Sequence, residues 1–364
     1  MPESFLISSS ENRLAETLDK AARGEGLLPE EAVRLFTDAG PREWEKIFSI
    51  ARNLTDKYFQ RRIHFFAPLY FSDICVNDCS YCGYKRSNNF RRKALTPESF
   101  LAEARYLWDQ GHRSILMVAA EHPVFSGPLR AASYLMQLQR NGLDFSIALE
   151  VGPYKQTEYR ELAGMGVSRF VLYQETYNRE LYAKLHKGPK EDFDFRYDAM
   201  GRALSAGIPE AGIGFLAGLG DIKEELAAVI QHARYLHEHT GKYPSTFALP
   251  RIQPARGTES FESSVRALTD EDFIRLAALL KAAVPSAGLV VSTRETPAFR
   301  DHLLEMGIGV THMSAGVHTE TGGYTASEAT KTEGQFSIQD SRSLNEMVEA
   351  VKRLGYQPCQ VAGF

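Results

Sequence analysis

A short apolar run followed by a longer amphipathic stretch occurs eight times after residue 60. The apolar runs are Phe65–Phe71, Ser114–Ala119, Phe145–Val151, Arg169–Tyr173, Gly212–Leu216, Thr246–Pro250, Gly288–Ser292 and Gly309–Met313. Runs of this length and composition are typical of parallel strands that are buried on both faces. Each run is followed by a stretch with a helical period, and we predict helices over Pro97–Gln110, Leu129–Gly142, Gln156–Gly166, Lys190–Gly207, Lys223–Thr240, Asp270–Ala283, Thr296–Gly307 and Ser343–Gly355. The alternation predicts an α/β fold, a complete (β/α)8 barrel of the TIM type.

The first 60 residues have a different pattern, which is helical throughout. Pro29 and Pro41 stand where helices begin, and the apolar residues after them recur at helical spacing. We therefore expect an N-terminal helical extension over residues 1–60 and the barrel over residues 61–364. A doubly wound open sheet is the alternative fold, but no feature marks the point at which its strand order would reverse.

The composition excludes several classes of protein. Hydrophobic residues make up 43% and charged residues 24% of the chain, as in a soluble globular protein. The net charge of −4 gives no general signal for nucleic acid or a membrane surface. No apolar run is long enough to span a bilayer, and the N-terminus has no signal-peptide core. We expect a cytoplasmic protein, because bunched cysteines favour a reducing compartment.

Three of the four cysteines lie together, directly after the first predicted strand. They are Cys75, Cys79 and Cys82. Three soft thiolates on one loop suit an iron–sulfur cluster or a zinc ion. A structural zinc site needs four ligands, so Cys359 or a histidine would have to complete it. A cubane on three thiolates instead leaves one iron free to bind a substrate or cosubstrate. The basic segment 85–93 that follows is either a solvated loop or a docking patch for an acidic electron donor.

In a barrel of this type the functional residues lie at the C-terminal ends of the strands. After the second strand, Ala120 lets backbone carbonyls approach a ligand closely, and Glu121 follows it. The third strand ends in Glu150, whose buried carboxylate needs a partner. That partner is either a bound ligand or Arg169. On the fifth strand, Gly214 belongs to a glycine run that leaves space for a flat group.

Arg294 at the end of the seventh strand is a candidate for binding a carboxylate. Its planar guanidinium fits a carboxylate with two parallel hydrogen bonds. Further donors would come from Thr293, Ser314 and the backbone of Gly316. This set predicts a site for the carboxylate of an amino acid. The alternative is a structural ion pair of Arg294 with Glu295 or Glu175.

The cysteine spacing, with the aromatic Tyr81 before the last cysteine, resembles the radical S-adenosylmethionine (SAM) superfamily. Segments along nearly the whole chain resemble its aromatic amino acid lyases: Leu69–Ser72, Cys82–Asn88, Tyr173–Tyr177, Gly188–Asp192, Pro250–Ile252, Ser292–Pro297 and Gln335–Arg342. The resemblance implies one site-differentiated [4Fe-4S] cluster on the three cysteines, with SAM on the fourth iron. It also implies SAM contacts from Tyr81, Ala120, Glu121, Glu150 and Gly214.

The implied reaction is cleavage of the Cα–Cβ bond of L-tyrosine to p-cresol and 2-iminoacetate (dehydroglycine), as in thiamine biosynthesis. The 5′-deoxyadenosyl radical would do the chemistry, so no side chain is assigned as catalytic. Related lyases of the hydrogenase-maturation or tryptophan type are alternatives, although the former carries a second cluster domain for which this chain has no cysteine motif. The family implies a flavodoxin- or ferredoxin-type electron donor, and thiazole synthase as recipient of the imine. Segment Thr319–Gly334 is either a lid or an ordinary loop.

Overall fold

Eight parallel strands form a closed barrel in the computed structural model, which describes residues 3–262, 265, 267–327, 329 and 331–360. The strands are β1 (Arg62–Ser72), β2 (Ser114–Ala119), β3 (Ser146–Glu150), β4 (Val167–Val171), β5 (Glu210–Gly214), β6 (Thr246–Ala248), β7 (Gly288–Val291) and β8 (Val310–Ser314). Each strand pairs with the next along the chain, and β1 pairs with both β2 and β8. The predicted TIM-type barrel is therefore confirmed, and an open sheet is excluded.

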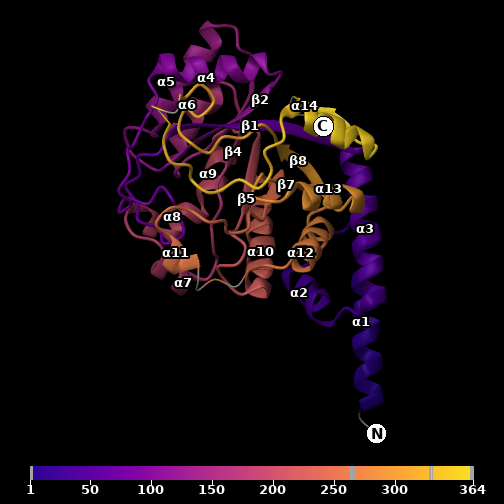
Figure 1. Ribbon diagram of the computed structural model, residues 1–364. Coiled ribbons are helices and arrows are strands. Elements are labelled where there is room, and N and C mark those ends of the chain that lie inside the picture. Colours follow the sequence, from indigo (N-terminus) through magenta and orange to yellow (C-terminus); the bar gives the residue numbers. More distant parts are fainter. Residues whose placement is uncertain (1–2, 263–264, 266, 328, 330, 361–364) are drawn as a thin grey trace.

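The helices that alternate with the strands lie around the outside of the barrel (Figure 1). They are α4 (Pro97–Asp109), α5 (Pro128–Arg140), α6 (Gln156–Gly164), α7 (Arg179–Leu185), α8 (Phe193–Tyr197), α9 (Ala199–Ser205), α10 (Ile222–Thr240), α11 (Glu259–Glu262), α12 (Asp270–Ala283), α13 (Pro297–Met306) and α14 (Leu344–Arg353). Most match the predicted helices to within a few residues. The predicted single helix over residues 190–207 is wrong, because the 3₁₀ turn Pro189–Glu191 precedes α8 and Asp192 caps α8 through Phe195 N–H.

A short ninth strand was not predicted. This strand, β9 (Gln357–Cys359), pairs in parallel with Arg62–His64 at the start of β1. Cys359 therefore lies near the N-terminal end of β1, whereas the three bunched cysteines follow its C-terminal end. At about 3.3 Å per residue, the eleven residues of β1 separate these two ends by roughly 30 Å.

Three helices precede the barrel: α1 (Glu3–Arg23), α2 (Pro29–Asp38) and α3 (Pro41–Phe59). Both α2 and α3 pack against α12, and α2 also packs against α10, while α1 contacts α2, α3 and α12 (Figure 1). The division at residue 60 stays a prediction, because α2 and α3 share their packed faces with helices of the barrel.

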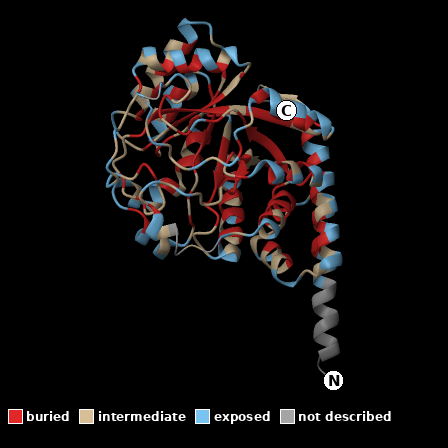
Figure 2. Cartoon of the chain, in the orientation of Figure 1, coloured by how far each residue is buried: buried red, intermediate tan, exposed pale blue. Residues whose placement is uncertain are grey.

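The apolar interior of the barrel continues into the layer between strands and helices, as the red segments in Figure 2 show. None of the described helices combines the length and apolar character that crossing a bilayer requires. After β8 a long segment passes over the barrel before α14 begins (Figure 1). Tyr324 of this segment donates to the Pro68 carbonyl at 2.8 Å, and Gly322 N–H donates to the Tyr70 carbonyl at 3.0 Å. The segment is thus fixed to β1.

Candidate functional site

A cavity of about 200 Å³ lies at the C-terminal ends of the barrel strands. Ten of the twelve predicted site residues line it: Cys75, Cys79, Tyr81, Cys82, Ala120, Glu121, Glu150, Thr293, Arg294 and Ser314. They come from β1, β2, β3, β7 and β8 or from the segments that follow these strands. The barrel topology alone brings them together, because parallel strands end at the same rim.

The two predicted glycines do not line the cavity. Gly316 N–H donates to the Arg342 carbonyl at 2.9 Å, so the prediction that it is a free donor for a ligand is wrong. Gly316 has φ +59°, a left-handed conformation that favours glycine. At Gly214 a Cβ would lie 2.0 Å from the Ala248 carbonyl oxygen. Glycine is needed there for close packing of β5 on β6, and no contact with a ligand is required to explain it.

Cys79 in the cysteine loop is buried, and Cys75 and Cys82 are half-buried. Burial raises the pKa of Cys75 to about 11 and that of Cys79 to about 12. The Asn77 N–H lies 3.4 Å from the Cys75 sulfur, which favours the thiolate only slightly. Thiolates in this setting require a compensating positive charge, which a bound metal group supplies. The donor set therefore fits a metal centre that all three sulfurs share.

Cys359 is excluded as the fourth ligand of a zinc site on the three cysteines, because it lies in β9 beside the other end of β1. Within the part of the chain that the structure describes, no three His, Cys, Asp or Glu side chains are placed to hold a single ion. A cluster has several irons, so its three ligands do not have to converge on one point.

Glu150 is not paired with Arg169, so that alternative is wrong. Arg169 instead donates to Glu210 through Nε at 2.7 Å. The Glu150 carboxyl lines the cavity and forms no ion pair with a described residue. Burial, followed by the nearby negative charge of Glu175, raises the pKa of Glu150 to about 7. A carboxyl group in this position is available to a ligand.

Arg294 also lacks the structural ion pairs that were the alternative to a ligand site. Glu295 accepts a hydrogen bond from Arg251 Nε at 2.8 Å. Glu175 pairs with Lys190 at 2.7 Å. The Arg294 guanidinium lies 3.5 Å from the centre of the Phe336 ring and donates to the Arg251 carbonyl at 3.3 Å.

Burial lowers the pKa of Arg294, yet an arginine stays charged at neutral pH. Among the described residues no carboxylate pairs with it. Arg294 is therefore a cavity-lining cation whose counter-charge an anionic ligand would supply.

Two residues with hydroxyl groups, Thr293 and Ser314, line the same cavity as Arg294. The Ser314 hydroxyl is buried and has no hydrogen-bond partner among the described residues. Its backbone is fixed, because Arg300 Nη2 donates to the Ser314 carbonyl at 2.6 Å. The Thr293 carbonyl accepts from Gln339 N–H at 2.7 Å. Both strand ends are thus anchored through their backbones, and the Ser314 hydroxyl remains available.

Sequence reasoning missed several residues that line the cavity: Tyr70, Glu175, Lys190, Arg196, Gln335 and Phe336. Lys190 and Arg196 fell within a stretch that was predicted to be one ordinary helix. Gln335 reaches the cavity because the segment after β8 folds back over the barrel, where its side-chain carbonyl accepts from the Tyr70 hydroxyl at 3.0 Å. The places of Lys190, Arg196 and Gln335 in the cavity wall follow only from the tertiary fold.

Comparisons with known proteins agree with this geometry. The model of the Radical SAM superfamily matches residues 69–233, and that of the Biotin and Thiamin Synthesis associated domain matches residues 248–357. The 2-iminoacetate synthase of Salmonella typhimurium is 31% identical over 348 residues, which cover 95% of this chain and 90% of that protein. The Escherichia coli 2-iminoacetate synthase gives the same identity and coverage.

A similar structure is that of HydG, a maturase of the [FeFe]-hydrogenase. It has a TM-score of 0.89 and 33% sequence identity, covering all of this chain and 81% of that one. The predicted cysteine motif, the barrel and these similarities lead to one conclusion. The chain belongs to the radical SAM superfamily, in the family of lyases that includes 2-iminoacetate synthase.

Proposed function

We propose that this protein cleaves the Cα–Cβ bond of L-tyrosine and releases p-cresol and 2-iminoacetate. The observation that carries the proposal is the unpaired Arg294 in the same cavity as the three cysteines. An amino-acid substrate needs its carboxylate fixed, and a half-buried guanidinium without a carboxylate partner suits that role. The similarity to two 2-iminoacetate synthases supports tyrosine as the amino acid.

Cys75, Cys79 and Cys82 would hold a [4Fe-4S] cluster, with SAM as its cosubstrate. When bound, this pair supplies one-electron cleavage of SAM to an organic radical. The chain itself binds and orients the substrate. Arg294 fixes the carboxylate of the substrate, and the Ser314 hydroxyl donates a hydrogen bond to the same carboxylate. Orientation of this kind accounts for much of the rate of a reaction between two bound molecules.

Residues that would contact SAM lie on the cysteine side of the cavity. The Glu121 carboxylate accepts from the Asn77 amide at 3.0 Å, which ties the end of β2 to the cysteine loop. The Ala120 carbonyl accepts one hydrogen bond, from Ser126 at 2.6 Å, and keeps its second lone pair. The Tyr81 hydroxyl is 2.6 Å from His186 Nε2, so its ring is held in the cavity wall.

The segment after β8 would enclose the substrate. An antiparallel bridge joins Glu320 to Gly334, and Gln335 and Phe336 beyond it line the cavity. The Tyr84 hydroxyl donates to the Thr319 carbonyl. We therefore favour a cover that excludes water from the radical and from the imine product, which water would hydrolyse.

Electrons would come from a small acidic donor of the flavodoxin or ferredoxin type. The basic segment 85–93 has two parts with different roles. Arg92 is used internally, because it donates to the carbonyls of Asp73 at 2.7 Å and Tyr84 at 2.9 Å. Arg86 and Arg91 are exposed and are free to meet an acidic surface. Thiazole synthase is the proposed recipient of the imine.

The test is anaerobic reconstitution with iron and sulfide, then reduction and incubation with SAM and either L-tyrosine or L-tryptophan. We expect 5′-deoxyadenosine together with p-cresol and glyoxylate, the hydrolysis product of the imine, from L-tyrosine alone. Carbon monoxide and cyanide among the products would favour the alternative of a hydrogenase-maturation type of lyase. Formation of 5′-deoxyadenosine with tryptophan and without p-cresol would reject tyrosine as the substrate.

A further inference from the structure

Three charged side chains form a chain of ion pairs on the cysteine side of the cavity. The Lys190 ammonium donates to Glu175 at 2.7 Å, and Arg196 Nη2 lies 3.4 Å from the same carboxylate oxygen. Arg196 Nε also donates to the Tyr173 carbonyl at 2.8 Å, at the end of β4. All three side chains line the cavity. Two cations against one anion leave one positive charge in excess.

The backbone at Glu175 is held in an unusual conformation. Its φ of +72° is in the left-handed region, which is unfavourable for a residue other than glycine. The Leu216 N–H donates to the Glu175 carbonyl at 2.8 Å and fixes this turn. Strain of this kind persists where the surrounding structure imposes it, and it occurs at functional sites. Here the turn places the carboxylate against Lys190.

The segment that carries Lys190 is docked on the cysteine loop. Their hydrogen bonds are Asp78 N–H to Lys187 O at 2.9 Å, Ser80 N–H to Leu185 O at 3.0 Å and Lys190 N–H to Asn77 Oδ1 at 2.9 Å. These bonds fall on residues between the cysteines. The loop that bears the thiols and the segment that bears the ammonium therefore form one unit.

Lys190 remains a cation beside the thiols. Burial and the neighbouring Arg196 oppose its charge, but the Glu175 carboxylate outweighs them, and the pKa of Lys190 lies above its ordinary value. Its ammonium is 5.6 Å from the centre of the Tyr81 ring. Lys190 and the three cysteines line the same cavity, and the Lys190 N–H bond to Asn77 fixes its backbone to the cysteine loop.

We propose that Lys190 is a positioning residue that holds a fixed positive charge against the three-thiolate cluster and stabilises its reduced form. The inference rests on the proposed function, because it takes the cysteines as cluster ligands. The reduced cluster carries one more negative charge than the oxidised cluster. A nearby cation therefore raises the reduction potential, and the strained Glu175 keeps that cation in place.

Two substitutions of opposite sign test the inference. Lys190→Met removes the cation while keeping a side chain of similar length, so the potential should shift downward. Glu175→Gln removes the anion and leaves two cations, so the potential should shift upward. The measurement is a redox titration of the reconstituted cluster in the absence of SAM and amino acid. The electron paramagnetic resonance signal of the cluster reports the fraction that is reduced. This readout does not depend on turnover.

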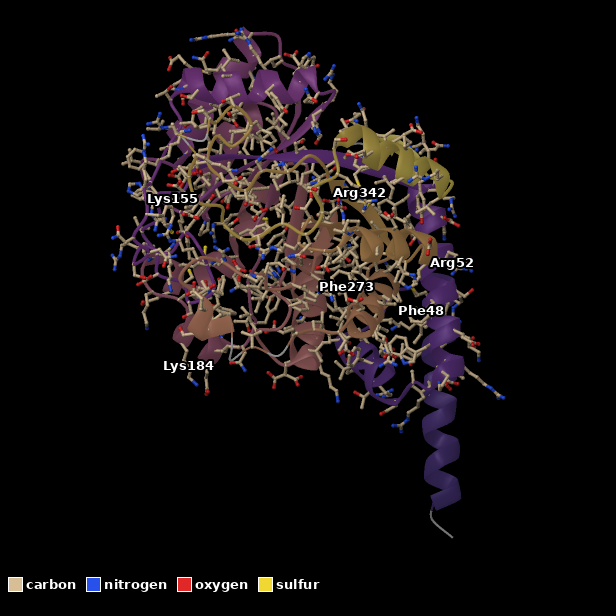
Figure 3. The ribbon with its side chains drawn as sticks, viewed as in Figure 1. Phe48, Arg52, Lys155, Lys184, Phe273 and Arg342 are labelled. Carbon is tan, nitrogen blue, oxygen red and sulfur yellow. The ribbon has the colours of Figure 1, made fainter. Side chains whose placement is uncertain are left out.

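Lys184→Met is the matched control. It changes the net charge as Lys190→Met does, but Lys184 is exposed at the end of α7, at the outer edge of the molecule (Figure 3). The reduction potential of the cluster in Lys184→Met should equal that in the unmodified protein. Lys190→Arg keeps the charge, so the reduction potential of its cluster should stay close to that of the unmodified protein.

The outcomes separate the two proposals. If the unmodified chain binds no cluster, the proposed function fails. If the unmodified chain binds one, and Lys190→Met and Glu175→Gln both leave its potential unchanged, only this inference is overturned. A lower reduction potential in both variants would also overturn the inference. The cause would then be a structural disturbance of the site and not the change of charge. If Lys190→Met does not retain a cluster, the test is the potential of the Glu175→Gln cluster. An upward shift supports the inference, and an unchanged or lower potential overturns it.

Discussion

At the residue level, some of the charged side chains that line the cavity form ion pairs with one another, and others do not. Glu175 is neutralised by Lys190 and Arg196. Glu150 and Arg294 have no such partners among the described residues, although both line the cavity. Because an uncompensated buried charge is costly, these two side chains mark where the polar groups of a ligand are expected.

Arg294→Lys should retain the cluster and lose most tyrosine turnover. Lysine keeps the charge but cannot form two parallel hydrogen bonds with a carboxylate. Hydrogen bonds to charged groups contribute about 1.5–3 kcal/mol, so kcat/KM for L-tyrosine should fall roughly 10- to 100-fold. Arg256→Lys, at an exposed pair with Glu333, is the control and should leave kcat/KM unchanged. Wild-type kcat/KM in Arg294→Lys would mean that the carboxylate binds elsewhere.

Glu150→Gln should change how stability depends on pH. Burial raises the pKa of Glu150 from 4.5 to about 7, so between these values the folded chain keeps a proton that the unfolded chain has released. This group therefore lowers stability as pH rises from about 4.5 to above 7. Thermal unfolding of the cluster-free chain at pH 5 and pH 8 should show that Glu150→Gln gains stability relative to wild type only at the higher pH. An equal difference at both pH values would contradict the assignment.

At the level of elements, a buried ion pair joins α13 to the segment before α14. Arg300 and Asp340 are fully buried and lie 2.5 Å apart. Arg342, between α13 and α14 in Figure 3, also pairs with Asp340, at 2.7 Å. Because Arg300 holds the carbonyl of Ser314 as well, this network sets the position of a strand end in the cavity.

Asp340→Ala should be strongly destabilising, because it leaves the buried Arg300 without its counter-charge. Loss of one partner of a buried pair costs about 3–5 kcal/mol. Glu333→Ala breaks an exposed pair with Arg256 and should cost less than about 1 kcal/mol. Urea unfolding of the two variants measures the difference. Similar losses in both would show that the buried network does not hold this region.

Gly188→Ala should impair cluster assembly without removing a ligand. Gly188 has φ +98°, and a Cβ there would lie 2.9 Å from both Asn77 Oδ1 and the Val76 carbonyl oxygen. The docked segment would have to move off the cysteine loop. Gly142→Ala shares the strain of a positive φ but meets no atom within 4 Å, so it should cost stability only. The iron content per chain after reconstitution should fall in Gly188→Ala and not in Gly142→Ala; equal iron content would contradict the docking.

At the level of the whole molecule, the sequence was sufficient for the barrel. All eight apolar runs overlap strands, because buried parallel strands need near-continuous apolar residues. Strands β4 and β5 each begin two residues earlier than predicted, at Val167 and Glu210, because backbone pairing extends beyond the apolar run. The three-residue β9 was missed, since Gln357–Cys359 has no strand pattern of its own and exists only beside β1.

Part of the site was predictable from the sequence. The cysteines were found from their close spacing, and Glu150 and Arg294 were found because the barrel rule assigns function to the ends of strands. Lys190 and Arg196 were not found, because their place depends on how the broken segment after α7 docks on the cysteine loop. A pattern along one chain cannot predict such a contact between distant segments.

The most direct test of the central claim is an anaerobic crystal structure of the reconstituted protein with SAM and L-tyrosine. We predict a [4Fe-4S] cluster on Cys75, Cys79 and Cys82, and a tyrosine carboxylate within hydrogen-bonding distance of the Arg294 guanidinium. A cluster on these cysteines with the carboxylate bound away from Arg294 would contradict the substrate site. A single metal ion, or no metal on the three cysteines, would contradict the proposal that these cysteines hold a [4Fe-4S] cluster.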